Sequence, residues 1–74
     1  MATGLSLTIP HGNESGPQRW NVFIKSGRAT WFIDGVMYGK DRPKESVIHH
    51  FDSLLSTLFA SEQRETLARF IASA

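Results

Sequence analysis

The chain has 74 residues and a net charge of +1, with 41% hydrophobic and 20% charged residues. A chain of this length forms one small domain that buries only about 60% of the surface its unfolded form exposes, and its composition excludes a disordered protein. Cysteine is absent and no apolar run reaches about 18 residues, which excludes disulfides, thiolate metal sites and a membrane-spanning helix. A chain without cysteine fits a reducing compartment, so we expect a cytoplasmic protein.

The N-terminal segment, residues 1–18, contains one candidate strand and one loop. The residues from Leu5 to Ile9 alternate between apolar and polar, which indicates a strand, although the pattern leaves open whether it joins a sheet. The stretch from Pro10 to Pro17 is rich in glycine, proline, asparagine and serine, so it predicts a loop. The first residues lack the basic start and long apolar stretch of a secretory signal, so we expect none.

Residues 19–39 predict a three-stranded antiparallel meander. Three runs of period-two alternation are joined at Ser26-Gly27 and Asp34-Gly35, which are typical two-residue hairpin turns. This register places Val22 opposite Trp31 and Trp31 opposite Tyr38, and a slip of one residue would scatter the apolar side chains over both faces. The expected apolar face consists of Trp20, Val22, Ile24, Ala29, Trp31, Ile33, Val36 and Tyr38.

Residues 41–73 predict two helices. Asp41 is the natural N-cap of the first, unless Pro43 takes the first helical position and makes Arg42 the cap. Ser61 is the expected cap of the second helix, and there is almost no linker before it, so the helices either turn sharply there or run on as one bent helix. We therefore expect one long helix and then a short one. Helical spacing places one apolar stripe at Ile48, Phe51, Leu55, Leu58 and Phe59, and another at Leu67, Phe70, Ile71 and Ala74.

These elements predict an α+β fold, in which an antiparallel three- to four-stranded β-meander precedes two C-terminal helices packed on one sheet face. Two helices can cover only one face of such a sheet, and we expect it to be the face with Trp20 and Trp31. The opposite face then carries Asn21, Phe23, Lys25, Arg28, Thr30, Phe32 and Met37.

Three interpretations of that opposite face remain open. In the first, the N-terminal segment folds over it and covers it with Leu5, Leu7 and Ile9, because small domains rarely leave an apolar patch bare. In the second, it binds a protein partner or another copy of the chain, since aromatic residues and methionine inside a polar rim are typical of protein interfaces. The residues of this predicted binding site are Phe23, Phe32, Met37, Lys25, Arg28 and Asn21.

The third interpretation is weak nucleic-acid binding, because residues 19–44 carry six basic residues against two acidic ones, whereas residues 45–74 carry two against four. A three-stranded meander followed by a helix, with YGKDRPKES at the junction, resembles the second half of the double-stranded RNA-binding fold and the arm-binding domains of some phage integrases. The usual consecutive lysines of the former are missing. Few basic residues argue against strong duplex binding. The site would use Lys25, Arg28, Lys40, Arg42 and Lys44.

No pattern predicts an enzyme, a metal site or a cofactor. His49 and His50 are adjacent on a predicted helix and point about 100° apart, whereas a helical metal pair needs a spacing of three or four residues. Each is expected to be a surface or boundary histidine. The sequence therefore predicts a small binding module, an adaptor or inhibitor comparable in size to those of phages and mobile elements, with the weak nucleic-acid binder as the alternative.

Overall fold

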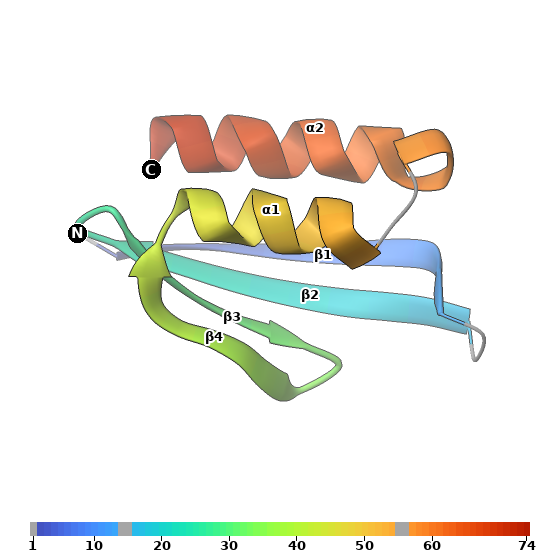
Figure 1. The fold of residues 1–74 in the computed structure, drawn as a ribbon, viewed down its shortest axis with the longest axis horizontal. Helices are drawn as coiled ribbons and strands as arrows, with labels where there is room; N and C mark the ends of the chain where they lie inside the picture. Colours follow the sequence, from blue (N-terminus) through green and yellow to red (C-terminus); the bar gives the residue numbers. More distant parts are fainter. Residues whose placement is uncertain (1, 14–15, 55–56) are drawn as a thin grey trace.

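The structure, a computed structural model, describes residues 2–13, 16–54 and 57–74. It confirms the α+β fold, with one antiparallel sheet in the order β1-β2-β3-β4 followed by two helices. Figure 1 shows the helices side by side and antiparallel to each other along the sheet. The elements are β1 (Ala2–Asn13), β2 (Gly16–Lys25), β3 (Arg28–Ile33), β4 (Val36–Pro43), α1 (Glu45–Leu54) and α2 (Thr57–Ser73).

The predicted register between β2 and β3 is confirmed. Trp20 pairs with Ile33, and Val22 pairs with Trp31. The four central residues of the two hairpin turns have positive φ, between 51° and 81°, as tight turns between twisted strands require. The local turn chemistry therefore sets the register that gathers the large apolar side chains on one face.

The N-terminal segment joins the sheet as β1, beside β2. Leu5 pairs with Val22 and Leu7 pairs with Trp20, so the alternating apolar residues extend the face that the helices bury. The hypothesis that this segment folds over the opposite face is therefore wrong. The long loop expected from Pro10 to Pro17 is also wrong, because β1 continues to Asn13 and β2 begins at Gly16.

Strand β4 departs from the predicted register because it contains irregularities. Trp31 pairs with Gly39 rather than with Tyr38, and Phe32 pairs with Met37, so Tyr38 is an additional residue in β4. A second irregularity lies around Asp41, whose φ is 51°. Val36 and Tyr38 were expected in the core but are more than half exposed, since β4 is the edge strand beside which only part of α1 packs.

The helix boundaries also differ from the prediction. Asp41 does not cap a helix, because β4 runs to Pro43 and α1 begins at Glu45. The first helix is the shorter one, with 10 residues against 17 in α2, and α2 has a kink at Ala60, one residue before the expected cap. The side chains of Leu55, Leu58 and Phe59, three members of the predicted stripe, lie outside the described residues.

The core lies between one face of the sheet and the two helices. It takes residues from the three strands β1, β2 and β3 and from both helices, so each of these elements contributes to one apolar layer. Its members are Leu7, Ile9, Trp20, Val22, Ile24, Ala29, Trp31, Ile33, Val47, Phe51, Ala60, Leu67 and Ile71.

Candidate interaction surface

The face of the sheet opposite the helices is called the open face below. Each of its described side chains is exposed or half-buried. Strand alternation assigns residues to it, since successive side chains point to opposite faces. Its two most exposed apolar residues, Phe23 and Met37, are each 50% exposed. The open face is made up of Ser6, Thr8, Arg19, Asn21, Phe23, Lys25, Arg28, Thr30, Phe32, Met37 and Lys40.

The open face has a small apolar centre. Phe32 pairs with Met37 across β3 and β4, and the ring of Phe23 packs edge-on against the ring of Phe32 at a centroid distance of 6.2 Å. The Phe23 ring also lies near Gly4 of β1, where a Cβ would approach Cδ1 of the ring to 3.3 Å. The sheet register therefore places the three apolar residues of the predicted site, Phe23, Phe32 and Met37, together on one surface.

The rim of this apolar centre is polar. Ser6 donates a hydrogen bond of 2.7 Å to Oδ1 of Asn21 on the neighbouring strand. Thr30 lies between Phe23 and Lys40, and its Oγ1 accepts a hydrogen bond from the backbone N–H of Asp41 at 3.2 Å. An apolar centre inside a polar rim is the arrangement found at protein interfaces.

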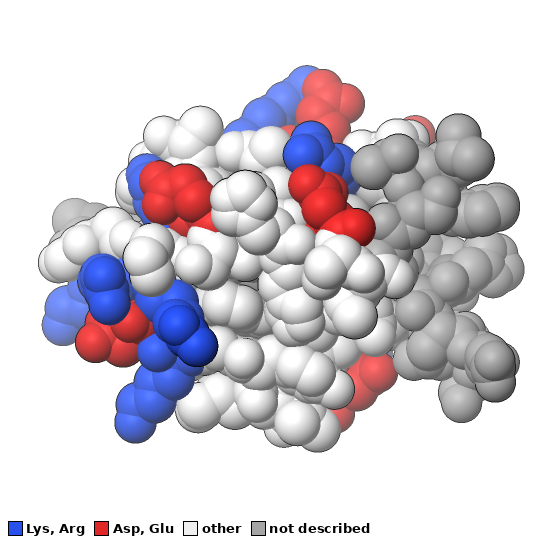
Figure 2. All heavy atoms as spheres, viewed as in Figure 1, with Lys and Arg blue, Asp and Glu red and all other residues white. Residues whose placement is uncertain are grey.

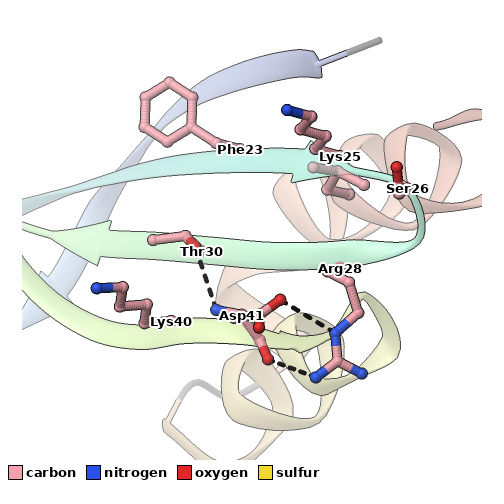
Figure 3. Close-up of a pocket in the computed structure, with 8 residues that line it drawn as sticks. Phe23, Lys25, Ser26, Arg28, Thr30, Lys40 and Asp41 are labelled. Carbon is pink, nitrogen blue, oxygen red and sulfur yellow. Dashed lines mark hydrogen bonds and ion pairs between the residues drawn. The ribbon is translucent and has the colours of Figure 1, made fainter.

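A hollow of about 490 Å³ opens beside Phe23 at one end of the open face. Figure 3 shows Lys25 and Lys40 on opposite sides of it, extending from β2 and β4 respectively. Arg28 is held at its border, where Nε donates to the Asp41 carboxylate at 3.2 Å and Nη2 donates to the Asp41 carbonyl at 2.6 Å. The hollow therefore combines an aromatic wall with two lysines and one ion-paired arginine.

The five basic residues predicted for nucleic-acid binding gather at one end of the molecule but not on one face. Figure 2 shows Lys and Arg side chains clustered at the end where β4 finishes and the β2–β3 turn lies. Three of them, Lys25, Arg28 and Lys40, surround the hollow. Arg42 pairs with Ala29 and so points to the helix side, and Lys44 donates a hydrogen bond to the Ala74 carbonyl at 3.1 Å. The predicted set is therefore divided between two surfaces.

On the helix side, His50 lies among aromatic rings, which the sequence did not indicate. The indole Nε1 of Trp31 donates a hydrogen bond of 2.8 Å to His50 Nδ1. The rings of Trp20, Trp31 and Tyr38 have centroids within 5.4 to 5.8 Å of the imidazole. Burial lowers the pKa of His50, because desolvation disfavours the charged imidazolium. His50 thus acts as a hydrogen-bond acceptor at the boundary of the core, and no sequence motif links residues 31 and 50.

A second charged contact joins the two helices. The Arg64 guanidinium in α2 donates hydrogen bonds of 2.7 and 3.0 Å to the two carboxylate oxygens of Asp52 in α1. This hydrogen bonding lowers the pKa of the Asp52 carboxyl group. The two side chains are 40% and 38% exposed, so water weakens the pair and it contributes little to stability.

The described part of the chain contains no group of three or more histidine or acidic side chains placed to bind a metal ion. Its helices are also too short or too polar to cross a membrane. Comparisons with protein-family models, curated proteins and solved structures found no match.

Proposed function

We propose that the domain is a non-enzymatic protein-interaction module, an adaptor or an inhibitor, that binds its partner through the open face. One observation carries this proposal. Phe23, Phe32 and Met37 form a contiguous apolar centre on a sheet face that the described helices and strands leave accessible to solvent. Contiguous apolar surface inside a polar rim is unfavourable in water and is typically retained where a partner covers it.

The geometry supports binding better than catalysis. The described polar side chains of the open face are lysine, arginine, serine, threonine and asparagine, and none of them is an acid or a histidine. General acid–base catalysis needs a group whose pKa is tuned near the working pH and which lies within hydrogen-bonding reach of a substrate. The lowered pKa of His50 belongs to a side chain packed on the helix side, where its Nδ1 is already occupied by Trp31.

Two neighbouring residues of β4 give a matched test. Met37 is 50% exposed on the open face, whereas Val36 is 57% exposed and pairs with Ile33 on the helix side. Met37→Asp should abolish association with a partner while the fold is retained, and Val36→Asp should leave association unchanged. Both substitutions place the same charge on the same edge strand, so only the face differs.

The measurement has two parts. Light scattering reports the mass of each variant over a range of concentrations, and affinity capture compares the proteins retained by the wild type with those retained by each variant. Circular dichroism verifies that each variant is folded. Phe32→Asp is the independent second substitution in the open face, with the same expected loss. If Met37→Asp and Phe32→Asp keep both the mass and the captured partners of the wild type, the open face is not the interface.

Weak nucleic-acid binding is the second candidate, and it is favoured by the position of three basic residues around the hollow beside Phe23. Aromatic side chains flanked by lysine and arginine can stack single-stranded bases and contact phosphates. The Arg28–Asp41 pair weighs against it, since it places a carboxylate at the border of the hollow. The two candidates differ in their response to salt, because phosphate contacts weaken steeply between about 50 and 200 mM salt.

A further inference from the structure

The charged side chains of the open face are mostly cationic. Strand alternation places Arg19, Lys25, Arg28 and Lys40 there, and the only carboxylate that borders the hollow among the described residues, that of Asp41, is bonded to Arg28. The ammonium groups of Lys25 and Lys40 form no hydrogen bond or ion pair with another described residue. A partner that covers this face therefore meets two ammonium groups that no described residue pairs with, beside an apolar centre.

This charge distribution argues against a second copy of the chain as the occupant. In a symmetric face-to-face dimer each open face would bury its cations against the same cationic face, and like charges brought together at an interface cost affinity. The acidic residues Glu45, Asp52, Glu62 and Glu65 belong to the helices, and two of them already pair with arginines of α2. A contact between the open face and those helices would be head-to-tail, which gives an open chain unless the rotation closes a ring.

We infer that the partner presents an acidic peptide segment, with a carboxylate in the hollow between Lys25 and Lys40 and an apolar side chain on Phe23 and Met37. This inference rests on the proposed function, since it names the chemistry of the partner for that same face. Complementary charge fixes the position of the segment and speeds its association, while the apolar contact supplies most of the affinity.

The geometry of the hollow suits a carboxylate. Lys25 and Lys40 reach it from β2 and β4, and Thr30 on the strand between them contributes a hydroxyl group at its floor. An ammonium–carboxylate hydrogen bond is stronger than a neutral one. The volume of about 490 Å³ accommodates an aspartate or glutamate side chain together with part of its backbone.

A nucleic-acid strand fits these groups less well. Useful affinity for a phosphate backbone often requires about six or more contacts, whereas the hollow offers two lysines that no described residue pairs with. Met37 adds aliphatic surface that packs against an apolar side chain of a peptide, whereas a base could stack only on the rings of Phe23 and Phe32 within the described open face.

The test is selection of random dodecapeptides displayed on phage against the immobilised full chain, with a labelled single-stranded oligothymidylate measured in parallel. Selected peptides are then synthesised both as such and with every Asp and Glu replaced by Asn and Gln. We expect selection to enrich acidic residues next to an apolar residue, and the amide versions to bind at least about tenfold more weakly.

Matched lysine substitutions show which positive charges contribute to binding of the peptides. Lys25→Gln and Lys40→Gln should each weaken the selected peptides roughly two- to fivefold. Lys44→Gln removes the same charge at the same end of the molecule but on the helix side, so it should leave the affinity unchanged. Equal losses in all three variants would show a response to net charge alone and would overturn the inference.

Other outcomes separate the inference from the proposed function. If neutral peptides are selected and Met37→Asp abolishes their binding, the open face is a protein-binding surface but its partner is not acidic. If the peptides bind Met37→Asp as well as the wild type, both proposals fail. Binding of oligothymidylate without enrichment of any peptide would overturn the inference in favour of a nucleic-acid ligand, and enrichment of nothing at all would overturn it as well.

Discussion

Adding a single methyl group at Gly39 should destabilise this protein, and the size of the loss tests how Trp31 packs. It lies within β4 directly beneath the indole of Trp31, with which it pairs across the sheet. A Cβ at this position would overlap the ring carbons Cη2, Cζ3 and Cζ2, the last at a distance of 2.6 Å. Glycine therefore allows the bulky ring of one strand to lie on the backbone of the next.

The indole cannot easily move away from an added methyl group. Trp31 is only 4% exposed, and its Nε1 is held by the 2.8 Å hydrogen bond to His50 in α1. Overpacking of a core site typically costs about 1–3 kcal/mol. In a domain of this size each kcal/mol lowers the melting temperature by roughly 4–8 °C, so Gly39→Ala should lower it by at least about 4 °C.

The sign of the effect makes this a sharp test. Replacing a glycine by alanine where the backbone conformation suits alanine usually stabilises a protein by about 0.4–1 kcal/mol, because the unfolded chain loses freedom. Gly39 does not have a positive φ, so without the Trp31 contact the substitution should stabilise. Thermal and urea denaturation followed by circular dichroism and tryptophan fluorescence measure the difference.

Two further variants complete the experiment. Gly4→Ala is the matched control, since its Cβ would meet only the exposed Phe23 ring at 3.3 Å, and its effect should stay within about 0.5 kcal/mol. Trp31→Phe removes the ring carbons that collide, so Gly39→Ala should cost less in that background, with a coupling energy of roughly 0.5–3 kcal/mol. A Gly39→Ala protein as stable as the wild type or more stable would refute the packing of Trp31 on Gly39.

Two other predictions concern the core. Trp31→Ala should cost about 3–5 kcal/mol, enough to unfold much of so small a domain, and a melting temperature within a degree or two of the wild type would contradict its central position. Because burial lowers the pKa of His50 below its ordinary value of 6.5, its contribution to stability should be complete above pH 6.5 and decline as the pH falls from there to the lowered pKa of the folded state. Urea denaturation between about pH 5 and 8 measures this decline, which His50→Gln should reduce and His49→Gln should not, and equal profiles for the two variants would exclude His50 as its origin.

Much of the sheet could be predicted because hairpin turns and strand alternation are local sequence patterns. Two-residue turns at Ser26-Gly27 and Asp34-Gly35 set the pairing of adjacent strands, and alternation then assigned Trp20 and Phe23 to opposite faces. The same local rules place the three apolar residues of the candidate site on one face of the sheet. Their role in binding stays a prediction, since neither the fold nor the comparisons test it.

The predictions for β4 and for the start of the first helix were wrong because contacts between residues apart in the sequence determine the structure there. The alternation of β4 failed after Met37, because the Trp31 ring occupies the position of a side chain at Gly39 and the strand has irregularities around Tyr38 and Asp41. The helix start at Asp41 failed because β4 continues to pair with β3 as far as Pro43, which lies opposite Arg28. The Asp41 carboxylate, expected to cap a helix, instead accepts a hydrogen bond from Arg28, 13 residues earlier. Secondary-structure propensity depends on a residue and its neighbours along the chain, so it does not include the contacts of Trp31 with Gly39 or of Arg28 with Asp41.

The sequence alone predicted the register of β2 and β3 and the side of the sheet on which each of their residues lies, because turn geometry and strand alternation act over a few residues. The N-terminal segment takes its place through long-range pairing that no local pattern specifies. It pairs with β2 and buries Leu7 and Ile9 under the helices. That placement leaves Phe23, Phe32 and Met37 uncovered by the described chain, so the candidate surface depends on a contact between residues far apart in the sequence.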